Sequence, residues 1–114
     1  MSDQSSSIVV RDNTESRSYD AMIGDRIVGS VIYETVHEGG HTRIVFRSTI
    51  VEPELRDRGI GAVMVEAALD DVRAKGATLT NHCSFVEDFI AANPQYADLL
   101  DAVHPGRARS HRAG

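Results

Sequence analysis

The periodicity of the sequence changes at Arg56-Asp57-Arg58-Gly59-Ile60-Gly61, and the expected fold follows from this change. Residues 43–51 before it read Arg-Ile-Val-Phe-Arg-Ser-Thr-Ile-Val, a composition that predicts a strand. Pro53 ends this strand, because proline donates no N–H to a ladder. From Ile60 onward, apolar residues recur at steps of three and four. This spacing predicts a helix of about four turns that ends at Lys75-Gly76.

A strand, a turn with two glycines and a helix start together form an anion site. The first N–H groups of a helix have no partners within it and point outward at the positive end of its dipole. Gly59 and Gly61 lack Cβ atoms, so a phosphate can approach the backbone, and Arg56 and Arg58 add positive charge. The alternative is a turn that only reverses the chain. The spacing matches neither the P-loop nor the three-glycine dinucleotide pattern.

The rest of the chain predicts a mixed α/β (α+β) fold. Upstream strands are expected at 8–11, 18–23 and 27–36, with a bulge at Gly29 and a loop at 37–40, as an antiparallel meander. Segment 77–81 should pair in parallel with 43–51, because a helix separates the two. The sheet then has four antiparallel strands and a parallel fifth, with one long helix.

Two short C-terminal helices complete the expected fold. Ser84 and Glu87 have the spacing of a capping box, which predicts a helix to about Ala92 that buries Phe85 among its apolar residues. Asn93-Pro94 should start another helix, since proline suits a first turn.

Composition and charge limit the class of protein. The 114 residues predict one domain at 8–103, between a disordered leader (1–7) and a flexible basic tail (104–114). The net charge of −5 argues against nucleic-acid binding and favours a cationic acceptor, although acidity can simply keep a domain soluble. No apolar run has the length of a membrane span or signal peptide, so a cytoplasmic location is expected. The single cysteine and five scattered histidines predict no metal site.

Five short motifs, in order, resemble one family. They are Ser48-Thr49, Glu54-Leu55-Arg56, Gly59-Ile60-Gly61, Cys83-x-Phe85-Val86 and Asn93-Pro94-x-Tyr96. Arg56-x-x-Gly59-x-Gly61 resembles the acyl-CoA motif of the GNAT superfamily of N-acetyltransferases. The whole set is similar to its small single-domain members, over approximately residues 9–100. The resemblance implies acetyl-CoA (coenzyme A) as the cofactor and an amine as the acceptor.

The resemblance also implies where the cofactor lies. Its pyrophosphate would bind Arg56, Asp57, Arg58, Gly59, Ile60, Gly61 and Ala62, and its pantetheine arm would pair with Ile50 and Val51. Two positions depart from the family. Ser48 stands where relatives often have histidine, and Asp57 stands where glycine is common. Only a few turn residues replace the helices that usually follow the first strand, so the acceptor side should be open.

Cys83 and Tyr96 are the candidate catalytic residues. A thiol at a helix N-terminus beside His82 favours the thiolate, and the resemblance implies that Cys83 could carry the acetyl group; the alternative is an inert buried cysteine. Tyr96 could protonate a leaving thiolate or could anchor the last helix in the core. Glu34 and Glu52 could act as bases through water, or could simply be solvated.

The expected function is acetyl-CoA-dependent N-acetyl transfer to an amine by direct attack, with Cys83 as an accessory candidate. The competing hypothesis is a non-catalytic module that binds CoA or acyl-CoA, or another protein. The sequence carries no signal for oligomeric state or for a particular acceptor.

Overall fold

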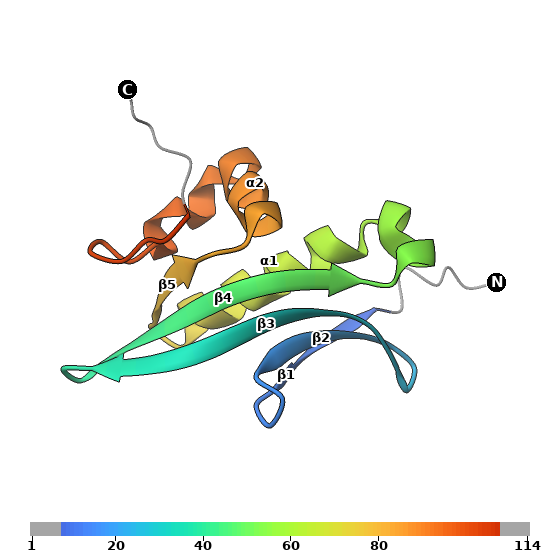
Figure 1. The fold of residues 1–114 in the computed structure, drawn as a ribbon, viewed down its shortest axis with the longest axis horizontal. Coiled ribbons are helices and arrows are strands. Elements are labelled where there is room, and N and C mark those ends of the chain that lie inside the picture. Colours follow the sequence, from blue (N-terminus) through green and yellow to red (C-terminus); the bar gives the residue numbers. More distant parts are fainter. Residues whose placement is uncertain (1–7, 108–114) are drawn as a thin grey trace.

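The computed structural model describes residues 8–107, in which five strands form one sheet in chain order (Figure 1). Strands β1 to β4 pair antiparallel, and β5 pairs in parallel with β4, which confirms the predicted mixed sheet. The strands are β1 Val9–Asn13, β2 Ser18–Ile23, β3 Arg26–Glu38, β4 His41–Val51 and β5 Thr78–Asn81. The expected leader and most of the expected tail lie outside the described residues.

Helix α1 (Ile60–Ala74) is the predicted long helix and lies against the sheet (Figure 1). It ends where expected, with Gly76 in the left-handed region at φ 68°. Its apolar side packs into one core with residues from the strands. The fully buried members of this core include Tyr19, Val31, Phe46, Met64, Val65, Leu69, Val72 and Leu79.

The prediction of a loop at residues 37–40 is wrong. β3 and β4 continue to Glu38 and His41, which lie opposite each other, so only Gly39 and Gly40 form the turn. Their φ values of 58° and 78° are both left-handed. Two-residue hairpin turns of this kind need two such residues, and glycine supplies them without steric cost.

Two register shifts interrupt the sheet. Ala21 of β2 faces Gly29 of β3 but Met22 faces Ile27, so β3 has a bulge whose extra residue is Val28, next to the expected position Gly29. The second shift was not expected: Ile32 faces Ser48 while Tyr33 faces Phe46. Strand β4 therefore carries one extra residue, which lies in its second half.

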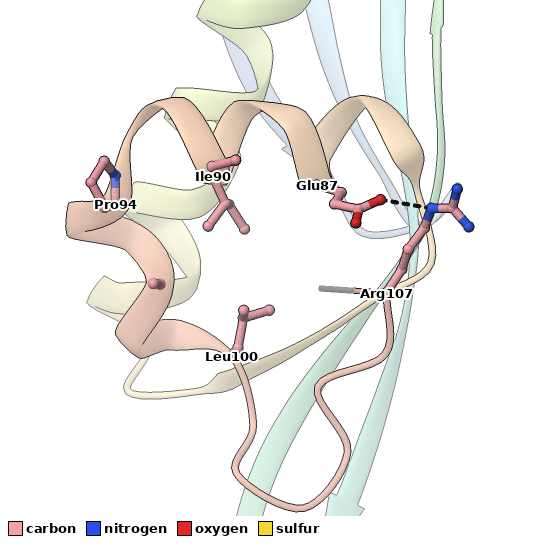
Figure 2. A pocket seen from close by; sticks show the side chains of 7 residues that line it. Glu87, Ile90, Pro94, Leu100 and Arg107 are labelled. Atoms are coloured by element: carbon pink, nitrogen blue, oxygen red, sulfur yellow. Dashed lines mark ion pairs between the residues drawn. The ribbon is translucent and has the colours of Figure 1, made fainter. Parts of the chain in front are cut away.

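The predicted start of α2 (Ser84–Ala92) needs correction. Its N-cap is Cys83 and makes no side-chain cap, so Ser84 and Glu87 form no capping box. Glu87 instead pairs with Arg107, with 3.0 Å between Oε1 and Nε (Figure 2). The expected burial of Phe85 is also wrong, because the side chain is 44% exposed. The second short helix is η3 (Pro94–Leu99), a 3-10 helix with proline in its first turn.

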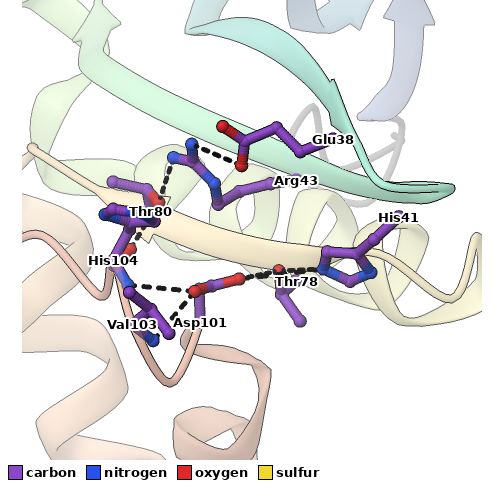
Figure 3. A network of polar contacts seen from close by, with 8 residues as sticks. All are labelled: Glu38, His41, Arg43, Thr78, Thr80, Asp101, Val103 and His104. Atoms are coloured by element: carbon purple, nitrogen blue, oxygen red, sulfur yellow. Dashed lines mark hydrogen bonds and ion pairs between the residues drawn. The ribbon is translucent and has the colours of Figure 1, made fainter.

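Residues beyond η3 run beside the free edge of β5. Leu100 bridges Leu79 and Gly106 bridges Asn81, both in parallel. Asp101 holds the segment: its carboxylate accepts the Thr78 hydroxyl at 2.6 Å and the N–H groups of Val103 and His104 (Figure 3). The segment is therefore bonded to β5 up to Arg107, whose N–H donates to the Asn81 carbonyl.

The Asp101 contacts predict a pH-dependent stability. The Thr78 hydroxyl and two N–H groups hold the pKa of the Asp101 carboxyl well below its usual range. A depressed folded-state pKa adds stability above the unfolded pKa of about 3.9, and this stability is lost as the pH falls below that value. Asp101→Asn should therefore lower the melting temperature by a few degrees above about pH 5, and the difference should shrink below about pH 4.

Melting curves of the wild type and Asp101→Asn between pH 3 and pH 7 measure this effect. Asp25→Asn, in the exposed turn before β3, is the matched control and should follow the wild type. A difference for Asp101→Asn that stays constant across this range would contradict the assignment.

Candidate functional site

Strands β4 and β5 part halfway along β4. β5 pairs with Arg43 to Phe46 only, and the last bond runs from the His82 N–H to the Phe46 carbonyl at 2.9 Å. β4 continues to Val51 with β3 as its neighbour, so it extends well beyond β5 (Figure 1). The extra residue, Arg47, lies where the two strands separate. The second half of β4 therefore has one edge that β5 does not cover.

Backbone alternation shows which residues face this edge. The Glu52 N–H donates to the Val28 carbonyl of β3 at 3.0 Å. The backbone N–H and C=O groups of Glu52 therefore point toward β3, and so do those of Ile50, two residues earlier. Val51 turns its groups toward the open edge, where its carbonyl accepts Nε–H of Arg56 at 3.4 Å. Of the two residues expected to pair with a ligand, only Val51 has its backbone placed for this, and the Ile50 side chain is 56% exposed.

The predicted anion turn is built from a short helix and a glycine. η2 (Pro53–Arg58) carries Arg56, Asp57 and Arg58, all exposed, and Gly59 follows at φ 77°. Nothing lies within 4 Å of a Cβ built on Gly59, so its outer side is open. The 3-10 helix was not predicted.

The first turn of α1 follows Gly59 directly. The Val63 N–H donates to the Gly59 carbonyl at 3.1 Å, so the amides of residues 60 to 62 precede the first bond of the helix. The Ile60 side chain is 1% exposed and belongs to the core. Only its backbone is placed to contact a ligand.

One hollow of about 410 Å³ unites the open edge and the turn. We call it the β4/α1 hollow; it is lined by Thr49, Val51, Arg56, Gly59, Gly61, Ala62 and Phe85. Five of the predicted cofactor residues line it. Sequence reasoning missed Thr49 and Phe85 as lining residues. The alternation of side chains along the strand could have identified Thr49, which shares a face with Val51. No pattern in the neighbouring sequence indicates that Phe85 lines the hollow.

Cys83 lies behind this hollow. Its Sγ is 3.2 Å from Oγ1 of Thr49, and the residue is buried. The buried side chain of Asn81 fixes its backbone, because Oδ1 accepts the Cys83 N–H at 3.0 Å and Nδ2 donates to the Cys83 carbonyl at 2.9 Å. The backbone N–H of Cys83 is thus already bonded and is not free to stabilise an oxyanion. The hydroxyl beside the thiol is no base at neutral pH.

Tyr96 is placed elsewhere, between η3 and α1. Its hydroxyl donates to the Asp70 carboxylate at 2.8 Å, and its ring lies tilted against that of Phe89 with centroids 6.0 Å apart. The hydrogen bond to Asp70 raises the pKa of Tyr96 to about 12. These contacts are those of a core anchor that holds η3 on α1.

The two carboxylates considered as bases both have arginine partners. Glu34 binds Arg47 through two bonds of 3.0 and 3.1 Å, and this contact lowers the pKa of Glu34. Glu52 pairs with Arg26. A carboxylate with a lowered pKa is a weaker base, so the contact of Glu34 with Arg47 does not favour proton removal from an amine.

Comparison with known proteins identifies the family. The profile of the GCN5-related N-acetyltransferases matches residues 18–99. The chain belongs to this family. The family profile therefore covers every strand from β2 onward, the glycine turn and both C-terminal helices. A comparison with curated protein sequences gives no match.

Solved structures of similar shape include acetyltransferases. An aminoglycoside acetyltransferase from an uncultured soil metagenomic sample, in complex with trehalose, is 15% identical with a TM-score of 0.53. The same enzyme in complex with sisomicin is 12% identical with a TM-score of 0.53. The alignments cover 84% and 85% of this chain but only 64% of the metagenomic enzyme. An acetyltransferase of Trypanosoma brucei is 19% identical, with 89% of this chain and 71% of that chain covered and a TM-score of 0.47.

A second hollow in this family member lies on the other side of α2. It measures about 160 Å³ between α2, η3 and the C-terminal segment, with the Glu87–Arg107 pair at its rim (Figure 2). None of the predicted site residues lines it. Within residues 8–107, no helix is long and apolar enough to cross a membrane, and no cluster of His, Cys, Asp and Glu could hold a metal ion.

The contacts of Tyr96 predict a structural effect when its hydroxyl is removed. Tyr96→Phe loses the bond to Asp70 and should lower the free energy of unfolding by about 1.5 kcal/mol. In an Asp70→Asn background the same change should cost less, because the charged acceptor is already gone. Urea unfolding of the four proteins measures this coupling. Unchanged stability together with a large loss of kcat would instead identify Tyr96 as an acid.

Proposed function

We propose that the chain transfers an acetyl group from acetyl-CoA to an amine. Family membership supports the reaction class, and one observation supports the site: the open edge of β4 and the N-terminal turn of α1 line a single hollow. A cofactor with a diphosphate at one end and an amide-bearing arm at the other needs these two features side by side.

The residues present fit such a cofactor. Amides in the first turn of α1 lie at the positive end of its dipole, and the open side of Gly59 leaves room for a diphosphate. Arg56 and Arg58 supply positive charge next to them. The uncovered edge of Val51 can hydrogen-bond an amide, as another strand would.

Direct transfer is the route that this arrangement favours. Bound acetyl-CoA supplies an acetyl thioester; the amine nitrogen bonds to the acetyl carbon, the carbon–sulfur bond breaks, and the thiol leaves with the proton that the amine loses. Cys83 is buried, its N–H is bonded to Asn81, and its thiol contacts the Thr49 hydroxyl, so none of these contacts supplies a base that would activate the thiol. Its role is that of an accessory residue near the reaction.

The expected acceptor is an amine that can bind to an open, acidic surface. Only four residues join β1 to β2, so no helix is inserted there to wall an acceptor site. The solved neighbour that binds sisomicin is longer than this chain, which covers 64% of it. The acceptor is therefore proposed only as a cationic amine, which the net charge of −5 would attract.

A non-catalytic module that binds CoA is the second candidate. It is favoured by the arginine partners of Glu34 and Glu52, because both carboxylates considered as bases are already held in ion pairs. Release of free thiol from acetyl-CoA across a panel of amines supports the enzyme. Tight CoA binding without release supports the module.

Removal of one charge from the hollow tests the cofactor site. Arg56→Gln loses one charge-assisted hydrogen bond, so the Kd for CoA in calorimetry should rise at least about tenfold. Arg11→Gln on β1, the far edge strand, is the matched control and should bind CoA as the wild type does. No heat of CoA binding to the wild-type protein would overturn the proposal.

Intact mass after incubation with acetyl-CoA tests the route. With direct transfer, the protein without an amine acceptor should gain no acetyl group on Cys83, and Cys83→Ala should keep turnover within a few-fold of the wild type. An acetyl group that appears in the wild type and is absent from Cys83→Ala would instead establish an acetyl-cysteine route.

A further inference from the structure

Phe85 is a large apolar side chain that the fold leaves partly in solvent. It lies in the first turn of α2 and is 44% exposed, while its neighbour Val86 is fully buried. Leaving this much aromatic surface in water costs free energy that burial would recover. The exposed side of the ring is therefore a surface that an apolar ligand group can cover.

The ring packs against the start of α1 at Gly61. A Cβ built on Gly61 would lie 2.8 Å from Cζ of Phe85, closer than real contacts allow, and 3.2 Å from Cε2, which is also tight. Gly59, in the same motif, has nothing within 4 Å of its built Cβ. The two glycines thus have different surroundings: one is open on its outer side, and the other makes room for an aromatic ring.

This contact places Phe85 in the β4/α1 hollow. Thr49 and Val51 line the hollow from β4, Gly61 and Ala62 line it from α1, and Phe85 lines it from α2. Two elements that are near each other in sequence, β4 and α1, therefore meet a third, α2, around one space. Among its lining residues, Phe85 is the aromatic one.

We propose that Phe85 is a binding and specificity residue for the pantetheine arm of CoA, and that Gly61 is glycine because the ring occupies its side. This rests on the proposed function, in which the arm lies along the open edge of β4. The amides of the arm pair with the backbone at Val51, and the ring packs on its methylene and methyl groups.

Chemistry and geometry agree on this assignment. The pantetheine arm alternates amides with apolar carbons, so a groove with one polar edge and one apolar wall matches it. The backbone of β4 supplies the first and Phe85 supplies the second. A half-exposed ring changes rotamer rapidly, so it can rest on Gly61 and move to make space for the arm.

Two ligands separate the arm from the diphosphate. CoA carries both, whereas 3′-phosphoadenosine 5′-diphosphate is CoA without its pantetheine arm. By calorimetry, Phe85→Ala should raise the Kd for CoA about tenfold and leave the Kd for the shorter ligand unchanged. Phe85→Leu should lose less CoA affinity, because it keeps apolar area. Equal CoA affinity of the wild type and Phe85→Ala would overturn the inference.

A double-mutant cycle tests why residue 61 is glycine. Gly61→Ala forces the ring out of its place and should weaken CoA binding several-fold. In the Phe85→Ala background the same substitution should have no further effect, because no ring remains to be displaced. If the glycine serves the approach of the diphosphate instead, Gly61→Ala weakens both ligands in both backgrounds, and this part of the inference fails.

Controls keep the two proposals distinguishable. Val63→Ala removes a side chain on α1 that is 43% exposed and lies outside the hollow lining, so it should change neither Kd. Melting curves establish that each variant is folded. Failure of the wild type to bind CoA overturns the proposed function itself, whereas wild-type binding that is insensitive to Phe85 overturns only the present inference.

Discussion

The site depends on the point at which β4 loses one of its two neighbours. From Arg43 to Phe46, β4 is paired with β3 on one edge and with β5 on the other, and the Phe46 carbonyl accepts the His82 N–H. The extra residue Arg47 then shifts the alternation by one, so that Ser48 faces Ile32 of β3. From there to Val51, one edge of the strand carries polar groups that β5 does not reach. A ligand with amides can satisfy those groups as a strand would.

On the β5 side, Asn81 fixes the point at which β4 and β5 separate. This fully buried residue pairs with Phe46 in the sheet, and its side chain bonds both polar groups of the Cys83 backbone. The Asn81 N–H donates to the carbonyl of Pro105, so the C-terminal segment holds the same residue from its other edge. Because buried amides need partners, these bonds direct the chain away from β4 and into α2. The hollow is thus maintained by residues that do not line it.

Local features of the sequence predicted most of the fold. The glycine turn, the periodicity of α1 and the glycine at its end depend on residues next to one another, and the structure confirms them. The bulge at Arg47 could not be predicted, because it arises from pairing between β3 and β4 rather than from the residue itself. The capping box at Ser84 failed for a related reason: Arg107, distant in sequence, takes the Glu87 carboxylate. The pairing of the C-terminal segment with β5 likewise rests on contacts across the chain.

Gly59 and Gly61 show that a short sequence pattern does not reveal why each of its glycines is needed. Both lack a Cβ, and sequence reasoning gave both the same reason, close approach of a phosphate. Gly59 has a left-handed φ and open space around it, which fits that reason. Gly61 lies in the helix with ordinary φ, where alanine would be the better helix former, and its free side is filled by Phe85. A glycine that gives up helix propensity has to be explained by what occupies the space, and here that neighbour comes from α2, more than twenty residues along the chain.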